Sequence, residues 1–145
     1  MACHGLFRSD NPHFSALKLV DGWLTTTDVA QLSLAGTFVA LSACESGRSE
    51  VLGGDEIIGL IRAFLGAGAA GLAVSQWLVE DETTAELMTT LYERYNSYAD
   101  TSTEASMGVD SELNYSASMR DAQLALKARH PHPYYWAPFI YVGRA

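Results

Sequence analysis

Residues 37–47, Thr-Phe-Val-Ala-Leu-Ser-Ala-Cys-Glu-Ser-Gly, constrain the fold more than any other stretch of the chain. The first half is apolar and rich in residues that favour β-strands, and the second half consists of small residues around Cys44, with Gly47 three positions later. In α/β folds, a buried strand followed by such a turn presents a reactive side chain at the carboxyl edge of the sheet. The stretch therefore predicts a strand over 37–43, and it makes Cys44 either a nucleophile or a buried core cysteine.

The composition limits the classes of function that are open to this chain. It has 145 residues, 48% of them apolar, and a formal net charge of −8, so we expect a single domain with its own core. This negative charge argues against binding to nucleic acids or anionic membranes, which requires clustered Lys and Arg. The sequence shows neither an apolar run of transmembrane length nor a signal-peptide pattern. Its two cysteines are therefore predicted to be reduced thiols in a cytoplasmic protein.

Hydrophobic periodicity and turn residues predict alternating strands and helices. A hairpin is expected over 14–25 with a two-residue turn at Asp21-Gly22, and Thr26 or Thr27 is expected to cap a short helix that ends near Leu34. The order strand, helix, strand, helix predicts an α/β fold with a parallel sheet. After the strand over 37–43, the expected elements are a helix over 55–66, a strand over 70–78, a helix over 80–95, a polar loop over 96–114, a helix over 116–129 with Ser118 and Asp121 at capping-box spacing, and an edge strand over 134–142.

His4 is the candidate partner of Cys44. A cysteine nucleophile needs a base or a cation that lowers the pKa of its thiol, and histidine can serve as both near neutral pH. Gly5, next to it, lets the backbone approach a substrate and leaves an N–H group for an oxyanion. The alternative for His4 is a frayed terminal residue. The few residues before Gly5 are not expected to form a strand, which suggests that the chain is a piece of a longer protein.

Two other patterns lack the context that their chemistry requires. Gly66, Gly68 and Gly71 match a dinucleotide-binding fingerprint, but a helix is expected before them and a strand after them, which reverses the required order. The possible metal ligands lack the spacing of known zinc sites; they are Cys3, His4, His13, His130 and His132. We therefore expect neither a metal ion nor another cofactor.

Six motifs follow one another over almost the whole chain. They are Ala2-Cys3-His4-Gly5, the hairpin residues Asp21-Gly22-Trp23-Leu24-Thr25, Leu41-Ser42-Ala43-Cys44-Glu45-Ser46-Gly47, Gly53-Gly54-Asp55, Ser75-Gln76-Trp77-Leu78-Val79-Glu80-Asp81, and His132-Pro133-Tyr134-Tyr135-Trp136-Ala137-Pro138-Phe139. Together they resemble a CHAT domain, the caspase-like and separase-related cysteine peptidase domain that is often fused to tetratricopeptide repeats.

The resemblance implies a caspase-like three-layer α/β sandwich with a mostly parallel sheet, and a protein or peptide as substrate. It implies that His4 is the general base, that Cys44 is the nucleophile, and that the backbone N–H groups of Gly5 and Cys44 form an oxyanion hole. It further implies a substrate-binding segment made of Ser75, Gln76, Trp77 and Asp81. Asp81 would receive a basic residue of the substrate, or it simply favours the start of a helix.

The chain departs from the family pattern in two places. The strands expected before His4 are missing, so we expect the chain to be the C-terminal part of a larger domain or protein. The polar loop over 96–114 is longer than usual. It is a lid, a self-cleavage site or a neutral surface insertion, and the insertion is the simplest explanation. Two alternatives to a peptidase follow: an inactive or incomplete fragment that acts as an interaction module in a repeat-containing protein, and a thiol redox protein that uses Cys3 and Cys44.

Overall fold

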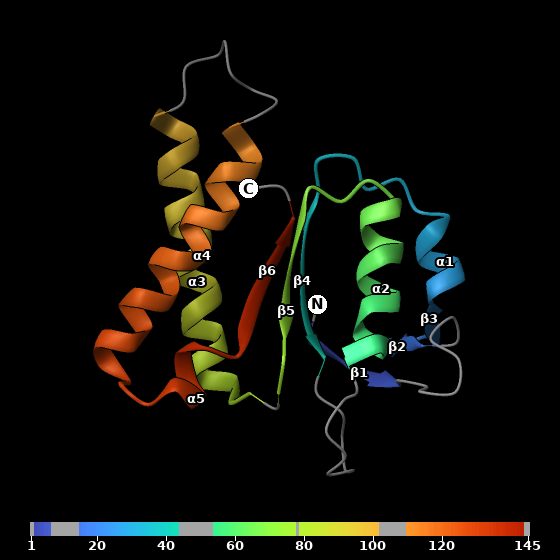
Figure 1. Cartoon of the computed structure of the whole chain (residues 1–145), viewed down its shortest axis with the longest axis horizontal. Coiled ribbons are helices and arrows are strands. Elements are labelled where there is room, and N and C mark those ends of the chain that lie inside the picture. The colour runs from blue at the N-terminus through green and yellow to red at the C-terminus, as the bar shows by residue number, and fades with distance from the viewer. Residues whose placement is uncertain (1, 7–14, 44–53, 78, 102–109, 144–145) are drawn as a thin grey trace.

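The structure is a computed structural model of the whole chain, and it describes residues 2–6, 15–43, 54–77, 79–101 and 110–143. In these residues, one sheet has the strand order β3-β2-β1-β4-β5-β6 (Figure 1). The strands are β1 Ala2–Leu6, β2 Ala16–Lys18, β3 Trp23–Thr25, β4 Phe38–Ala43, β5 Gly71–Ser75 and β6 Phe139–Gly143.

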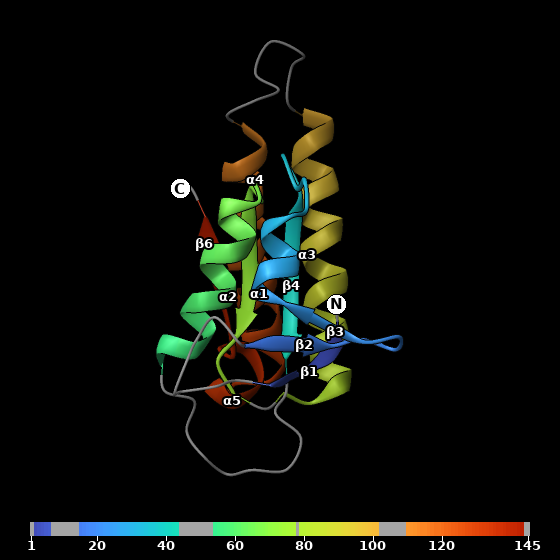
Figure 2. The same ribbon diagram turned by 90° about the vertical axis from the view of Figure 1, so that its right-hand side faces the viewer.

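The sheet is mixed. Strand β4 pairs in parallel with β1 and with β5, whereas the β1–β2, β2–β3 and β5–β6 pairs are antiparallel. Figure 2 shows how strongly the sheet twists, because β2 and β3 run across the direction of β4. The predicted α/β class is confirmed, but the predicted mostly parallel sheet is not, since only the three central strands are parallel to one another.

Helices cover both faces of the sheet and complete three layers (Figure 1). Helices α1 Thr26–Ala30 and α2 Gly54–Gly66 lie on one face, and helices α3 Asp81–Thr101 and α4 Asp110–Arg129 lie on the other. The short helix α5, Pro133–Trp136, precedes β6. Among the described residues, none of the helices has both the length and the apolar character that crossing a membrane requires.

Consecutive side chains of β5 point to opposite faces of the sheet, and they belong to two separate core clusters. Leu72 and Val74 belong to the cluster on the α1/α2 face, and Ala73 belongs to the cluster on the α3/α4 face. Every residue of β5 is buried, as expected for a strand that is covered on both faces. The strand predicted over 70–78 is therefore shorter than expected: Gln76 and Trp77 follow its end and are exposed.

The prediction that no strand holds His4 is wrong. His4 lies within β1, whose backbone pairs with β2 on one side and with β4 on the other. A five-residue strand is not stable by itself, but its hydrogen bonds to two neighbouring strands stabilise it. A local sequence pattern cannot show this, because the partners of β1 come from later parts of the chain.

The hairpin is confirmed as β2 and β3, but its turn differs from the prediction. Its loop has four residues, Leu19–Gly22, closed by a hydrogen bond of 2.8 Å from the Leu19 N–H to the Gly22 carbonyl. Gly22 therefore needs no left-handed conformation. The N-cap of α1 is Thr25, one residue before the two candidates, and it forms a capping box with Asp28. The hydrogen bonds from the Thr25 side chain and backbone lower the pKa of the Asp28 carboxyl.

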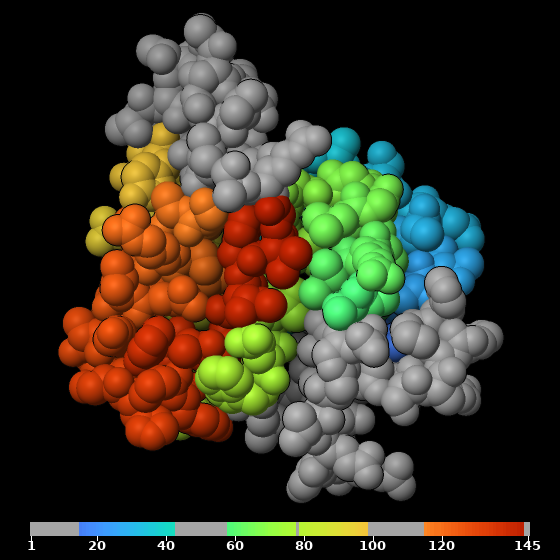
Figure 3. Space-filling view, in the orientation of Figure 1, coloured from blue at the N-terminus to red at the C-terminus, as the bar shows by residue number. Residues whose placement is uncertain are grey.

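The predicted long polar loop over 96–114 is wrong for most of its length. Helix α3 continues to Thr101 and α4 begins at Asp110. Of the stretch 96–114, residues 102–109 lie outside the described part. Ser118 is therefore a fully buried residue inside α4 and not a helix cap. The predicted edge strand begins later than expected, because Tyr134 to Trp136 belong to α5. Strand β6 does occupy the edge of the sheet, and Figure 3 shows it at the surface between α2 and α4.

Candidate active site

The parallel register of β1 and β4 relates the two candidate catalytic residues. Ala2 pairs with Ser42 and Cys3 pairs with Ala43. His4 is the next residue along β1, and Cys44 is the next residue along the chain after Ala43, which ends β4. Cys44 itself lies outside the described residues. The backbone of His4 and Gly5 thus extends to the carboxyl edge of β4, the edge that precedes Cys44 in the chain.

The expected substrate-binding segment leaves the sheet at the same edge. Strands β4 and β5 are parallel, with Leu41 opposite Val74, so Ser75 lies at the level of the last residues of β4. Figure 1 shows the ends of β4 and β5 on one side of the sheet, close to α5. The structure therefore places His4 and Gly5 in β1, and the Ser75–Trp77 segment at the end of β5, on the two sides of the end of β4.

Ser75 differs from the residues that follow it. It is 3% exposed, and its Oγ is buried with no hydrogen-bond partner among the described residues. It lies on the α3/α4 face, two residues after Ala73. Gln76 is exposed, and so is 37% of Trp77. The outer surface of the segment is thus provided by Gln76 and Trp77, whereas Ser75 is buried.

Two long-range hydrogen bonds hold this segment, and the sequence analysis did not predict them. The Trp77 indole Nε1–H donates to the carbonyl of Tyr134 at 3.3 Å, and the Gln76 N–H donates to the carbonyl of Pro138 at 2.8 Å. The partners are far apart in the sequence, so no periodicity or spacing indicates the contact. The only signal was that both segments belong to motifs of the resemblance. Figure 3 shows the segment after β5 at the surface beside α5.

Asp81 is the first residue of α3 and is exposed, and Glu82 follows it in the first turn. Carboxylates in this position are stabilised by the positive end of the helix dipole. This geometry agrees with the simpler of the two interpretations of Asp81. It also leaves the carboxylate open to solvent on the side where the Trp77 segment enters α3.

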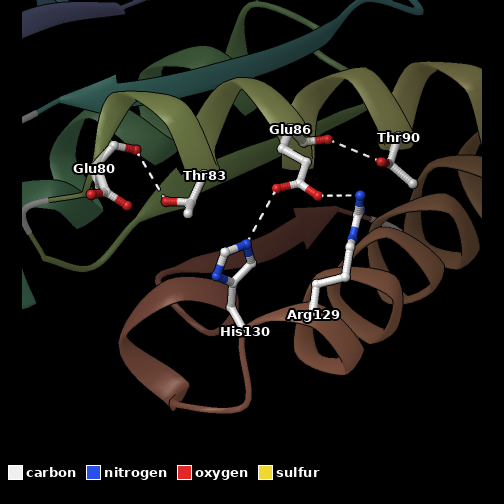
Figure 4. Close-up of polar contacts among 6 residues, drawn as sticks. All are labelled: Glu80, Thr83, Glu86, Thr90, Arg129 and His130. Atoms are coloured by element: carbon white, nitrogen blue, oxygen red, sulfur yellow. Dashed lines mark hydrogen bonds and ion pairs between the residues drawn. The ribbon is translucent and has the colours of Figure 1, made fainter.

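A polar cluster joins α3 to the end of α4 (Figure 4). Glu86 forms an ion pair with Arg129 and lies 3.5 Å from the Nε2 of His130. On the same helix, Thr83 and Thr90 bond through their hydroxyls to the carbonyls of Glu80 and Glu86, at 3.2 and 3.0 Å. His130 thus contacts α3, and His132 is the N-cap residue of α5. Among the described residues, no group of three His, Cys, Asp or Glu side chains is placed to bind a metal ion.

A sheet covered by helices on both faces agrees with the three-layer α/β fold that the resemblance implies. The comparison with protein families agrees: the model of the CHAT domain family matches residues 1–144. The chain belongs to the CHAT domain family, which confirms the resemblance drawn from its motifs. Among curated proteins, no significant match to the chain is found.

Proposed function

We propose that this CHAT domain is a cysteine endopeptidase that uses His4 as general base and Cys44 as nucleophile. The observation that supports the proposal most is the parallel register of β1 and β4, in which His4 and Cys44 each come one position after the paired residues Cys3 and Ala43. A residue within β1 that lies beside the end of β4 and the residue that follows β4 can approach a single bond of a substrate. The substrate is a protein or peptide, and the proposal includes a cytoplasmic location and fusion to tetratricopeptide repeats.

In the proposed reaction, the His4 imidazole removes the proton of the Cys44 thiol, and the thiolate attacks the carbonyl carbon of the scissile peptide bond. The negative charge that develops on the carbonyl oxygen is stabilised by the N–H groups of Gly5 and Cys44. The C–N bond then breaks, the leaving amine takes the proton from the imidazolium, and a thioester remains. Water, deprotonated by His4, hydrolyses the thioester and regenerates the thiol.

The segment after β5 forms the substrate-facing surface in this proposal. Gln76 and Trp77 are exposed there and can contact the peptide, whereas the Ser75 side chain is buried and does not reach the surface. Asp81 is exposed at the start of α3 and offers a carboxylate to a basic side chain of the substrate. A basic residue before the scissile bond is therefore the first substrate class to test.

The two cysteines allow a matched test of the nucleophile. We expect Cys44→Ala to lower kcat/KM for a peptide library by at least about 10³-fold and to abolish labelling by a thiol-reactive peptide probe. Cys3→Ala serves as the control, because Cys3 lies in β1 opposite Ala43 and is not assigned a chemical role. Circular dichroism should show that both variants keep their fold. If Cys44→Ala cleaved as fast as the parent, the assignment would be wrong.

The alternative of an incomplete interaction module was based on the missing strands that are expected before His4. Part of that argument, a His4 without a strand, no longer applies, because β1 holds His4 between β2 and β4. The thiol redox alternative has no observation in its favour among the described residues. Labelling and peptide turnover together separate these classes. An interaction module would leave Cys44 no more reactive than Cys3, whereas a thiol redox protein would react with the probe but would not cleave peptide.

A further inference from the structure

Trp77 combines a partly exposed ring with a hydrogen bond to a distant part of the chain. With 37% of its surface exposed, its ring lies partly in solvent. Its indole N–H donates to the carbonyl of Tyr134, which is 57 positions later in the chain. The neighbouring bond from the Gln76 N–H to the Pro138 carbonyl fixes the backbone before the ring, but it does not set the direction of the ring. The orientation of the indole therefore depends on where α5 holds Tyr134.

Helix α5 has only four residues, and none of them is buried. A single turn of helix is not stable in isolation, so its position depends on the contacts at its two ends. At its start, the Nδ1 of His132 accepts a hydrogen bond of 3.2 Å from the Tyr134 N–H, and Pro133 occupies the first helical position. The same residue, Tyr134, thus donates its N–H to His132 and receives the indole N–H of Trp77 at its carbonyl.

The residues around α5 are held by polar and ring contacts to α3 and α4. Before α5, the Nε2 of His130 lies 3.5 Å from Glu86 of α3. The Trp136 indole donates to the carbonyl of Pro131 at 3.3 Å, and the Lys127 ammonium of α4 lies 4.8 Å from the centre of the Trp136 ring. These contacts fix both ends of the segment to the helical layer. In the first turn, the bond from the Tyr134 N–H to the His132 Nδ1 acts together with a bond of 3.2 Å from the Tyr135 N–H to the His132 carbonyl. Of these two bonds, only the first depends on the side chain of His132.

We infer that His132 is a positioning residue for the Trp77 surface: it caps α5, α5 holds the Tyr134 carbonyl, and that carbonyl orients the indole. The inference rests on the proposed function only where it concerns substrate binding. The chemistry requires a side-chain acceptor at position 132, because the Tyr134 N–H is a donor. Asparagine supplies such an acceptor and is among the preferred N-cap residues, whereas alanine does not.

The test compares His132→Ala, His132→Asn and Trp77→Phe by peptide turnover. One neutral hydrogen bond corresponds to about a fivefold change. We therefore expect His132→Ala to raise KM about fivefold with kcat nearly unchanged, and His132→Asn to restore the parental KM. Trp77→Phe keeps an aromatic ring but loses the N–H donor, so it should raise KM by a similar factor. Adding His132→Ala to Trp77→Phe should cause no further rise, since both act on one chain of contacts.

Trp23 provides the matched control for the tryptophan substitution. It is 48% exposed in β3, and the Lys18 ammonium lies 4.9 Å from its ring centre. Trp23→Phe should leave KM and kcat at the parental values. A second readout needs no activity: the fluorescence of Trp77, taken as the difference between the parent and Trp77→Phe, should shift to longer wavelength in His132→Ala and return in His132→Asn.

The outcomes separate the inference from the proposed function. If peptide is not cleaved by any form of the protein, the proposed function fails, and the emission of Trp77 alone decides the inference. If peptide is cleaved but His132→Ala changes neither KM nor the emission, the inference is wrong and the proposed function stands. Additive effects of His132→Ala and Trp77→Phe on KM would also overturn it, because they would show that the two residues act separately.

Discussion

Aromatic side chains gather at the two opposite ends of β4 and β5, and they are held there in different ways. At the end where β4 and β5 begin, Tyr115 stacks between Phe38 and Tyr95, with ring centres 4.4 and 4.0 Å apart and planes within 8° and 6° of parallel. At the end where β5 finishes, Trp77 donates an indole hydrogen bond to Tyr134 and is partly exposed. We call the first group, which is completed by Tyr92 and Tyr141, the aromatic stack.

The difference shows how one residue type can serve two purposes. Stacked rings exchange contact with water for contact with each other, and this stabilises the fold. The aromatic stack joins strand β4 to both long helices, α3 and α4. A hydrogen bond to an exposed indole adds little stability, but it fixes a direction and leaves the ring face open. We therefore expect the stack to determine stability and the Trp77 end to determine function.

The largest difference in stability is expected between the variants Tyr115→Ala and Trp77→Ala. Removing the Tyr115 ring leaves two aromatic neighbours without their partner, so we expect the free energy of unfolding to fall by about 3 kcal/mol. Trp77→Ala removes a partly exposed ring and should cost less than about 1 kcal/mol. Urea denaturation followed by circular dichroism measures both. Equal losses in the two variants would contradict the division between stability and function.

A second test concerns two glycines of the sheet that leave room for the Tyr141 ring of the aromatic stack. Gly71 and Gly143 are opposite each other in β5 and β6, and the Tyr141 ring lies over both. A Cβ atom at Gly71 would lie 2.6 Å from the Tyr141 hydroxyl. We expect Gly71→Ala to displace that ring and to cost about 1–3 kcal/mol.

Gly22→Ala is the control for Gly71→Ala, because a Cβ atom at Gly22 meets nothing within 4 Å. This change should alter the free energy of unfolding by no more than about 0.5 kcal/mol. Thermal unfolding of the two variants makes the comparison. A Gly71→Ala protein as stable as Gly22→Ala would mean that Tyr141 is free to move and that the stack does not depend on its position.

The smallest expected effect appears at alkaline pH. Burial of the Tyr115 hydroxyl, assisted by its hydrogen bond with Tyr95, raises the pKa of Tyr115 above its usual value of 10.0. Its stabilising contribution is thus complete below the pKa of the unfolded chain and is lost as the pH rises towards the folded pKa. Stability should decline above about pH 10, and the decline should be smaller in Tyr115→Phe. If the stability of the parent and of Tyr115→Phe declined equally, groups other than Tyr115 would be responsible.

The local elements near Cys44 were predictable because their signals are local. The apolar run of β4, the helical spacing of α2 and the buried run of β5 each depend on neighbouring residues, so the sequence predicts them within a few positions. The polar stretch over 96–114 misled the prediction because Ser, Thr, Asp and Asn favour loops. Contacts between distant residues outweigh this preference: Tyr98 donates a hydrogen bond of 2.7 Å to Asp121, and Tyr95 stacks on Tyr115.

By itself, the sequence determined the class of the fold, the family and the candidate pair His4 and Cys44, because these depend on residue types and their order. Only the tertiary structure decided that His4 lies in a strand, since β1 is stabilised by pairing with β2 and β4. Only the tertiary structure joined Trp77 to Tyr134, since that hydrogen bond exists once β5 and β6 are paired and α5 lies beside the end of β5. The physical reason is the same in both cases: hydrogen bonds between distant segments form only when the chain has folded.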